Sequence, residues 1–134
     1  DGKNINKIRL GYLILLGIET NDQQADLNYI VKKTIGLRIF NDQKGHMNLS
    51  IQDINGEILV VSQFTLCANT KKGRRPSFIN AAPSKQALII YQQYCKQLTL
   101  QNLHVKTGKF GSNMQIELIN DGPVTIILDS NDKA

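Results

Sequence analysis

The sequence predicts an α+β domain with a mixed sheet and two helices. Several segments are rich in β-branched and apolar residues, two others carry apolar residues at helical spacing, and the predicted helices are separated by pairs of predicted strands. Strict alternation of strands and helices would instead indicate a fully parallel sheet. The 134 residues suit one domain that buries a core without disulfides, so residues 1–134 are expected to fold as a unit.

Leu10–Ile18 is almost entirely apolar and is predicted to be a strand buried on both faces. The period then changes to that of a helix over Asp22–Ile35, which ends before a glycine. Thr20 with Gln23 three residues later resembles a capping box at the start of this helix.

Leu37–Phe40 is predicted to be a short strand that a turn at residues 41–45 closes. Glu57–Leu66 is predicted to be a long apolar strand, because it follows the turn pair Asn55-Gly56. Ala68–Ala81 is polar and basic, and it contains a glycine and a proline, so we expect a loop there.

Pro83-Ser84 is predicted to open the second helix. Its apolar stripe consists of Leu88, Tyr91, Cys95 and Leu98. Three strands are predicted to end the domain, at Val105–Phe110, Met114–Ile119 and Val124–Asp129.

The positive charge of the chain is concentrated in one loop. The formal net charge is +5, and Lys71, Lys72, Arg74 and Arg75 account for four of these charges. Such a local excess predicts a polyanionic partner that binds at this loop.

The cysteine count, the length of the apolar runs and the first residues indicate the cellular compartment and the start of the domain. Two cysteines cannot make a disulfide framework, which favours a reducing, intracellular setting, and no apolar run is long enough for a membrane span. No targeting segment is visible, and the first residues, Asp1-Gly2, are a common hairpin-turn pair. We therefore expect that a preceding strand is missing from this sequence.

Metal and triad chemistry have little support in the sequence. His46, His104, Cys67 and Cys95 lack the spacing of a metal site, so we expect no metal and no cofactor. Neither Ser62 nor Cys67 lies in a known nucleophile motif, and no phosphate-binding glycine loop is present.

Two segments are candidates for a ligand site. Ser62-Gln63-Phe64-Thr65-Leu66 places hydroxyl and amide groups at the end of an apolar strand, where ligands often bind, although a strand that emerges into solvent would look the same. Asn120-Asp121-Gly122-Pro123 contains a Gly-Pro bond that, if it is cis, would present two rigid carbonyls; a trans turn is the commoner alternative. The basic loop follows the first segment directly, and Phe78 beside it is suited to stack on a base of a nucleic acid.

These motifs, in this order, resemble the D-aminoacyl-tRNA deacylase family, formerly called D-tyrosyl-tRNA deacylase. The resemblance runs from Leu10 to Asp129. It is carried by the segments Ser62–Leu66, Thr70–Phe78, Gly108–Gly111 with Met114, and Asn120–Thr125.

The resemblance implies a metal-free, cofactor-free cytoplasmic homodimer that removes D-amino acids, and mischarged glycine, from the 3′ end of tRNA. It implies that Ser62, Gln63, Phe64 and Thr65 form the catalytic segment. It further implies that Gly122 and Pro123 select for chirality as a cis pair inserted into the other subunit, and that Met114 lines the pocket. In this interpretation, Lys71, Lys72, Arg74 and Arg75 bind the tRNA.

The fold that the resemblance implies is of the three-layer α/β type, with mixed, largely antiparallel sheets in a barrel-like sandwich with two helices. The family normally opens with a strand containing Gln-Arg-Val, which is absent here, and Cys67 stands where many members have tyrosine. The arginine of that strand is thought to hold the Gly-Pro turn, so a chain without it is expected to be loosened or inactive.

The resemblance implies ester hydrolysis by water, assisted by the 2′-hydroxyl of the terminal adenosine. Backbone N–H groups around Gln63 and Phe64, with the Ser62 hydroxyl, are expected to bind the oxyanion. Three alternatives stay open: Thr65 as a covalent nucleophile, a hydrolase that depends on Cys67, and a non-catalytic RNA-binding module that uses the basic loop.

Overall fold

A computed structural model describes residues 5–132 of the chain. Its main sheet has three strands in the order β1-β4-β5, formed by Gly11–Leu16, Glu57–Ser62 and His104–Thr107. Two further strands, β2 (Phe40–Asn41) and β3 (Met47–Leu49), make a small antiparallel ladder. The sequence-predicted mixture of helices and strands is confirmed.

The three strands of the main sheet are all parallel, so the expectation of largely antiparallel sheets is wrong for this part of the chain. The physical reason lies in the connections. Helix α1 (Gln24–Gly36) separates β1 from β4, and helix α2 (Ser84–Leu100) separates β4 from β5. A helical crossover returns the chain to the same end of the sheet, which produces parallel neighbours.

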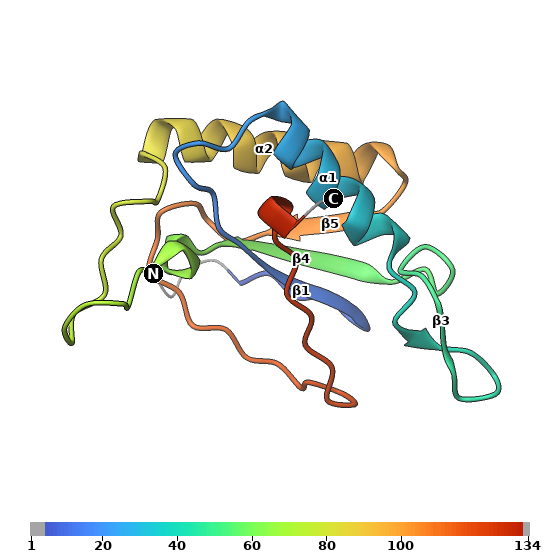
Figure 1. The fold of residues 1–134 in the computed structure, drawn as a ribbon. Coiled ribbons are helices and arrows are strands. Elements are labelled where there is room, and N and C mark those ends of the chain that lie inside the picture. Colours follow the sequence, from blue (N-terminus) through green and yellow to red (C-terminus); the bar gives the residue numbers. More distant parts are fainter. Residues whose placement is uncertain (1–4, 133–134) are drawn as a thin grey trace.

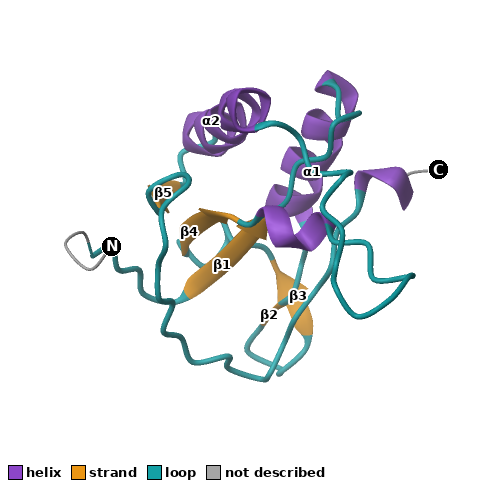
Figure 2. Cartoon of the chain, turned by 90° about the vertical axis from the view of Figure 1, so that its left-hand side faces the viewer, coloured by secondary structure: helices purple, strands orange, loops and turns teal. Residues whose placement is uncertain are grey.

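Both helices lie on one face of the sheet and contact each other (Figures 1 and 2). The core forms between this helix layer and the sheet. It consists of Ile18, Leu27, Ile51, Ile58, Val60, Tyr91, Tyr94, Leu98 and Leu103. The sheet is not closed into a barrel within residues 5–132, because β1 and β5 are both edge strands.

The predicted first strand and both helices are confirmed, with small shifts of their ends. Strand β1 is only half-buried, because both helices cover the same face of the sheet (Figures 1 and 2), so the prediction of burial on both faces is wrong. Thr20 does not cap α1, since its hydroxyl group lies 3.3 Å from the Ala81 carbonyl oxygen. The Gln23 N–H instead donates to the Asp26 carboxylate at 2.8 Å.

The long strand predicted over Glu57–Leu66 ends early, at Ser62. The chain then makes a single 3₁₀ turn, η1 (Phe64–Cys67). This turn redirects the chain away from the sheet and into the basic loop.

The strands predicted at Met114–Ile119 and Val124–Asp129 are absent. An alternating pattern makes a strand only where a neighbouring backbone completes the hydrogen bonds, and residues 5–132 supply none to this segment. It runs in extended form to η2 (Ser130–Asp132) with Ile119 and Ile127 largely exposed. The expectation about Asp1-Gly2 lies outside the described residues.

Candidate functional site

The carboxyl ends of the three parallel strands meet at one edge of the main sheet. Leu16 at the end of β1 pairs with Ser62 at the end of β4, and Val60 pairs with Thr107 at the end of β5. Ligands of parallel sheets commonly bind at this edge, because the strand ends leave backbone groups without ladder partners. The polar segment that begins at Ser62 therefore lies where a ligand site is expected.

Gln63 is fixed by its backbone and its side chain. Its N–H donates to the Leu16 carbonyl at 2.8 Å, and its carbonyl accepts from the Leu66 N–H at 3.1 Å. Its side-chain amide donates to the Thr65 hydroxyl oxygen. The Gln63 N–H is thus used inside the fold, so of the N–H groups around Gln63 and Phe64 this one is not available to an oxyanion.

The neighbouring polar groups remain open. Within residues 5–132, the N–H groups of Phe64 and Thr65 and the hydroxyl of Ser62 have no hydrogen-bond partner. Phe64 and Thr65 are exposed, and Ser62 is half-buried. Two N–H groups on consecutive peptides and one nearby hydroxyl group suit a developing negative charge on oxygen.

Met114 is brought to the same edge by the loop that follows β5. The Gly108 N–H donates to the Val60 carbonyl at 3.0 Å, which holds the start of this loop against β4. A β-carbon placed on Gly108 would lie 3.0 Å from the Met114 sulfur and 3.7 Å from a methyl carbon of Val61. The lack of a side chain at Gly108 therefore allows Met114 to pack beside the end of β4.

The basic loop starts where η1 ends. Two backbone hydrogen bonds between Asn69 and Ser77, of 2.7 and 2.9 Å, close it at its base. The four predicted cations, Lys71, Lys72, Arg74 and Arg75, are all exposed at its end, and none forms an ion pair within the described part of the chain. The loop projects from the molecule at the left of Figure 1.

Two aromatic rings join the loop to the polar segment. The rings of Phe64 and Phe78 meet edge to face, with centroids 5.1 Å apart and planes at 68°. Phe64 is 57% exposed and Phe78 36% exposed, so both rings remain accessible to a ligand. An accessible aromatic pair beside a cationic loop is typical of single-stranded nucleic-acid binding.

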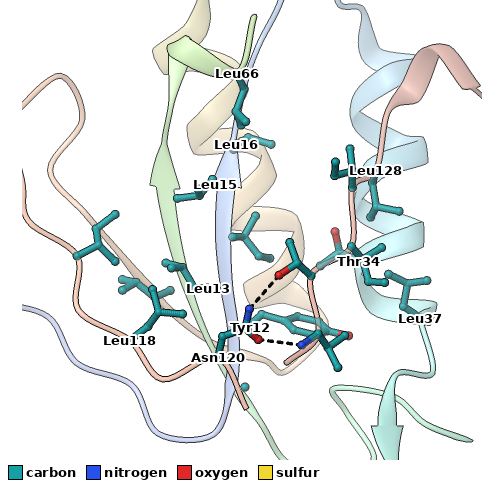
Figure 3. A pocket seen from close by; sticks show the side chains of 18 of the residues that line it. Tyr12, Leu13, Leu15, Leu16, Thr34, Leu37, Leu66, Leu118, Asn120 and Leu128 are labelled. Atoms are coloured by element: carbon teal, nitrogen blue, oxygen red, sulfur yellow. Dashed lines mark hydrogen bonds between the residues drawn. The ribbon is translucent and has the colours of Figure 1, made fainter. Parts of the chain in front are cut away.

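The Gly122-Pro123 peptide bond is cis. Its turn is held by the Asn120 side chain, which accepts from the Val124 N–H and donates to the Thr125 hydroxyl, each at 2.9 Å (Figure 3). The turn lies at the bottom of Figure 1, well apart from η1 and the basic loop. Within one chain, Gly122 and Pro123 are therefore not brought to Ser62, Gln63 or Thr65.

A groove of about 2150 Å³ separates the C-terminal segment from β1. Its walls are mostly apolar, with Leu13 and Leu15 on one side and Leu118 on the other (Figure 3). The Tyr12 hydroxyl is buried at this groove without a partner in residues 5–132, and burial raises the pKa of Tyr12 to about 12.

Both histidines lie far from the polar segment, and the Cys67 thiol next to it is buried. His46 lies between β2 and β3, and His104 begins β5, at the opposite end of the sheet from Ser62. The Cys67 thiol is buried against the Ile18 carbonyl, and burial raises the pKa of this thiol, which disfavours the reactive thiolate. A Cys67-dependent hydrolase is therefore disfavoured. Across residues 5–132, no group of histidine, cysteine and acidic side chains is arranged to hold a metal ion.

No helix within residues 5–132 is long and apolar enough to cross a membrane.

The chain matches a family model described as "D-Tyr-tRNA(Tyr) deacylase" over residues 1–129. It is 50% identical over 130 residues to a D-aminoacyl-tRNA deacylase of Thermosipho africanus, covering 97% of this chain and 87% of that protein. It is 54% identical over 134 residues to the protein of the same name from Flavobacterium psychrophilum, covering 99% and 89%.

Two solved structures are similar to this one. A chain titled "c-Myc DNA Unwinding Element Binding Protein" aligns with a TM-score of 0.86 at 43% identity, over 93% of this chain and 85% of that chain. A probable eukaryotic D-amino acid tRNA deacylase aligns with a TM-score of 0.67 at 17% identity, over 83% and 82%. The second similarity concerns the fold alone.

Proposed function

This chain belongs to the D-Tyr-tRNA(Tyr) deacylase family, and we propose from this premise that it is an editing hydrolase acting on D-aminoacyl-tRNA. Water cleaves the ester between the amino acid and the 3′ end of tRNA and releases a free D-amino acid and tRNA. Mischarged glycyl-tRNA is a second substrate. The observation that carries the proposal is the family match across residues 1–129, which includes the polar segment at the strand ends.

The Phe64 and Thr65 N–H groups and the Ser62 hydroxyl stabilise the oxyanion that forms when water attacks the ester carbonyl. This assignment is supported by the lack of any other partner for these donors within residues 5–132. One such donor typically contributes ~3 kcal/mol to stabilisation of a transition state. Gln63 holds the segment in place through its bonds to Leu16 and Thr65.

The attacking water is activated by the substrate itself, through the 2′-hydroxyl of the terminal adenosine. The protein then contributes mainly by positioning the ester. Thr65 is a poor candidate for a covalent nucleophile. Among residues 5–132 its hydroxyl oxygen is hydrogen-bonded only to the Gln63 amide, which cannot accept its proton through the donor nitrogen.

Chirality is selected by Gly122 and Pro123 of a second subunit in a cytoplasmic homodimer. The separation of this turn from η1 within one chain supports a contribution from a partner. The backbone carbonyls of the turn fill the space into which an L side chain would project, whereas a D side chain points away. Glycine is accepted because it has no side chain, and Met114 lines the pocket beside Gly108.

The basic loop binds the phosphates of the tRNA acceptor end. Its four cations have no internal partners within the described residues, so phosphates meet no competing carboxylate there. The exposed ring of Phe78, together with Phe64, offers a stacking surface for a base near the 3′ end.

A deacylation assay with matched D- and L-aminoacyl-tRNA tests the proposal. We expect release of the D-amino acid and no comparable release of the L-amino acid. Binding of many RNAs without hydrolysis of either ester would contradict it and would favour the non-catalytic RNA-binding module.

A further inference from the structure

We propose that Tyr91 of α2 is a positioning residue for this hydrolysis, holding the loop after β5 against the end of β4. The proposal rests on the proposed deacylase function. It assigns a role to a helix residue whose side chain lies behind the sheet edge and does not reach the substrate.

The Tyr91 hydroxyl lies within hydrogen-bond distance of both β4 and the start of the loop after β5. Its oxygen lies 3.1 Å from the Val60 carbonyl oxygen on β4 and 3.3 Å from the Gly108 carbonyl oxygen just after β5. The Val60 carbonyl also accepts the Gly108 N–H at 3.0 Å. One buried phenol thus fixes the peptide at which the β5 chain leaves the sheet.

The ring of Tyr91 makes a second contact with the loop after β5. It lies against the ring of Phe110, with centroids 5.5 Å apart, so the loop is held at residues 108 and 110. Tyr91 is only 4% exposed. Burial raises the pKa of Tyr91 to about 12, which keeps the hydroxyl protonated, and therefore a donor, at any physiological pH.

Both anchored positions lead directly to the site. Val60 precedes Ser62 by two residues on the same strand, and Gly108 packs against Met114. A shift of the Gly108 peptide would therefore change the distance between the Ser62 edge and the Met114 side chain. Misplacement of the groups that surround the reacting ester lowers the catalytic rate even when the substrate still binds.

Tyr94 provides a matched control on the same helix. It is equally buried, and its hydroxyl lies 2.8 Å from the Thr34 hydroxyl on α1, away from the strand ends. Burial also raises its pKa to about 12. Tyr91→Phe and Tyr94→Phe each remove one buried, hydrogen-bonded hydroxyl group from α2 and keep the ring, so their costs in stability should be similar.

The experiment compares kcat and KM for D-aminoacyl-tRNA, and the melting temperature, among wild type and the two variants. We expect Tyr91→Phe to lower kcat about five- to tenfold with KM changed by less than about twofold, because the basic loop is untouched. Tyr94→Phe should leave both constants within about twofold of wild type at a comparable loss in melting temperature.

Gly108→Ala gives a second measurement that does not depend on the phenol. Its β-carbon would crowd the Met114 sulfur, so the same fall in kcat is expected while Tyr91 stays intact. If Tyr91→Phe fails to fold, wild-type kcat in Gly108→Ala overturns the proposal.

Equal kinetics for the two phenylalanine variants would also overturn it, because the role of Tyr91 would then be structural only. A wild-type protein that hydrolyses D-aminoacyl-tRNA while Tyr91→Phe keeps its full kcat refutes the positioning role alone. A wild-type protein without this activity refutes the proposed function, and the role of Tyr91 falls with it.

Discussion

Thr65 lies on the polar segment at the strand ends, and its hydroxyl oxygen is already engaged by the Gln63 side chain. We expect Thr65→Ala to retain deacylation within about tenfold of wild type, since only one hydrogen bond that orders Gln63 is lost. A covalent nucleophile would show a far larger loss, of several orders of magnitude. Single-turnover deacylation of D-aminoacyl-tRNA distinguishes the two, and a loss above about a thousandfold would reinstate Thr65 as the nucleophile.

Gly122 adopts φ = +130°, a conformation that disfavours any side chain. A β-carbon there would lie 2.8 Å from a Val124 methyl carbon and 3.1 Å from the Val124 nitrogen. Gly122→Ala should therefore displace the carbonyls proposed to exclude L side chains, and the ratio of D to L hydrolysis should fall at least about tenfold.

Gly45→Ala is the matched control for that measurement. Gly45 also has positive φ, at +77°, but no atom lies within 4 Å of its added β-carbon, and it belongs to the turn between β2 and β3. Its variant should keep the wild-type D/L ratio. An unchanged ratio in Gly122→Ala would refute the assignment of chiral selection to this turn.

At the scale of single elements, α2 carries three groups whose pKa burial raises: Cys95 to about 11, and Tyr91 and Tyr94 each to about 12. In the unfolded chain these groups ionise at lower pH, from about 9 for the thiol and 10 for the phenols. The folded state therefore binds more protons between these values. Its stability is fully present below pH 9 and should fall as the pH rises from about 9 to 12.

Urea unfolding at a series of pH values checks this dependence. Cys95→Ala removes the thiol and should flatten the first part of the decline, between about pH 9 and 11. A free energy of unfolding that is constant up to pH 11 in the wild type would contradict the burial of these groups.

The charge of the basic loop is predicted to strengthen tRNA binding without contributing to ester hydrolysis. Lys71→Gln with Lys72→Gln should weaken tRNA binding and make the slope of log K against log salt shallower by up to about one unit per lost phosphate contact. Hydrolysis of a minimal aminoacyl-adenosine ester should change much less, because it carries no acceptor-stem phosphates.

Lys32→Gln with Lys96→Gln is the charge-matched control, since both lysines are exposed on the helices and away from the loop. This variant should bind tRNA with nearly the wild-type salt dependence. Equal weakening by both pairs would mean that net charge, and not the loop, attracts the RNA.

The sequence predicts an element well when the signal lies within a few residues, and poorly when the element depends on packing against a distant segment. The helices followed from spacing, and the polar segment from the change of residue type after Val61, because both signals lie within a few residues. The parallel pairing of β1 with β4 is set by packing across 40 residues and more, which local patterns do not record. Tyr94 was missed as a core residue for a similar reason, since its partner is Thr34 on the other helix.

At the scale of the whole molecule, the two parts of the proposed site, the turn in the C-terminal segment and the polar segment at the sheet edge, lie apart within one chain. The family match spans residues 1–129 of one chain, yet the turn at residues 120–124 lies apart from η1 (Figure 1), and the strands predicted around this turn have no backbone partner within residues 5–132. The sequence could therefore locate both halves of the proposed site without showing how they meet. The proposed homodimer would resolve this separation, because each subunit could place its turn at the polar segment of the other.

Mixing a variant with an impaired catalytic segment and a variant with impaired chiral selection tests whether the site is shared. One subunit carries an impaired catalytic segment, with Ser62→Ala and Phe64→Pro, where the proline removes a proposed oxyanion donor. The other carries a displaced turn, with Gly122→Val. Neither homodimer has an intact site if the turn acts across the interface, but a mixed dimer has one, formed by the good segment of one subunit and the good turn of the other.

Random exchange of equal amounts makes about half of the dimers mixed, each with one of two sites intact, so about a quarter of the wild-type D-selective activity should return. Unmixed samples at the same total concentration set the baseline, and sedimentation before and after mixing verifies that each variant still forms dimers. Recovery of D-selective hydrolysis on mixing requires that Gly122 act on the partner subunit's site. If the mixture stays at the baseline although mixed dimers have formed, each chain must complete its own site, and the C-terminal segment must fold back toward η1 when substrate binds.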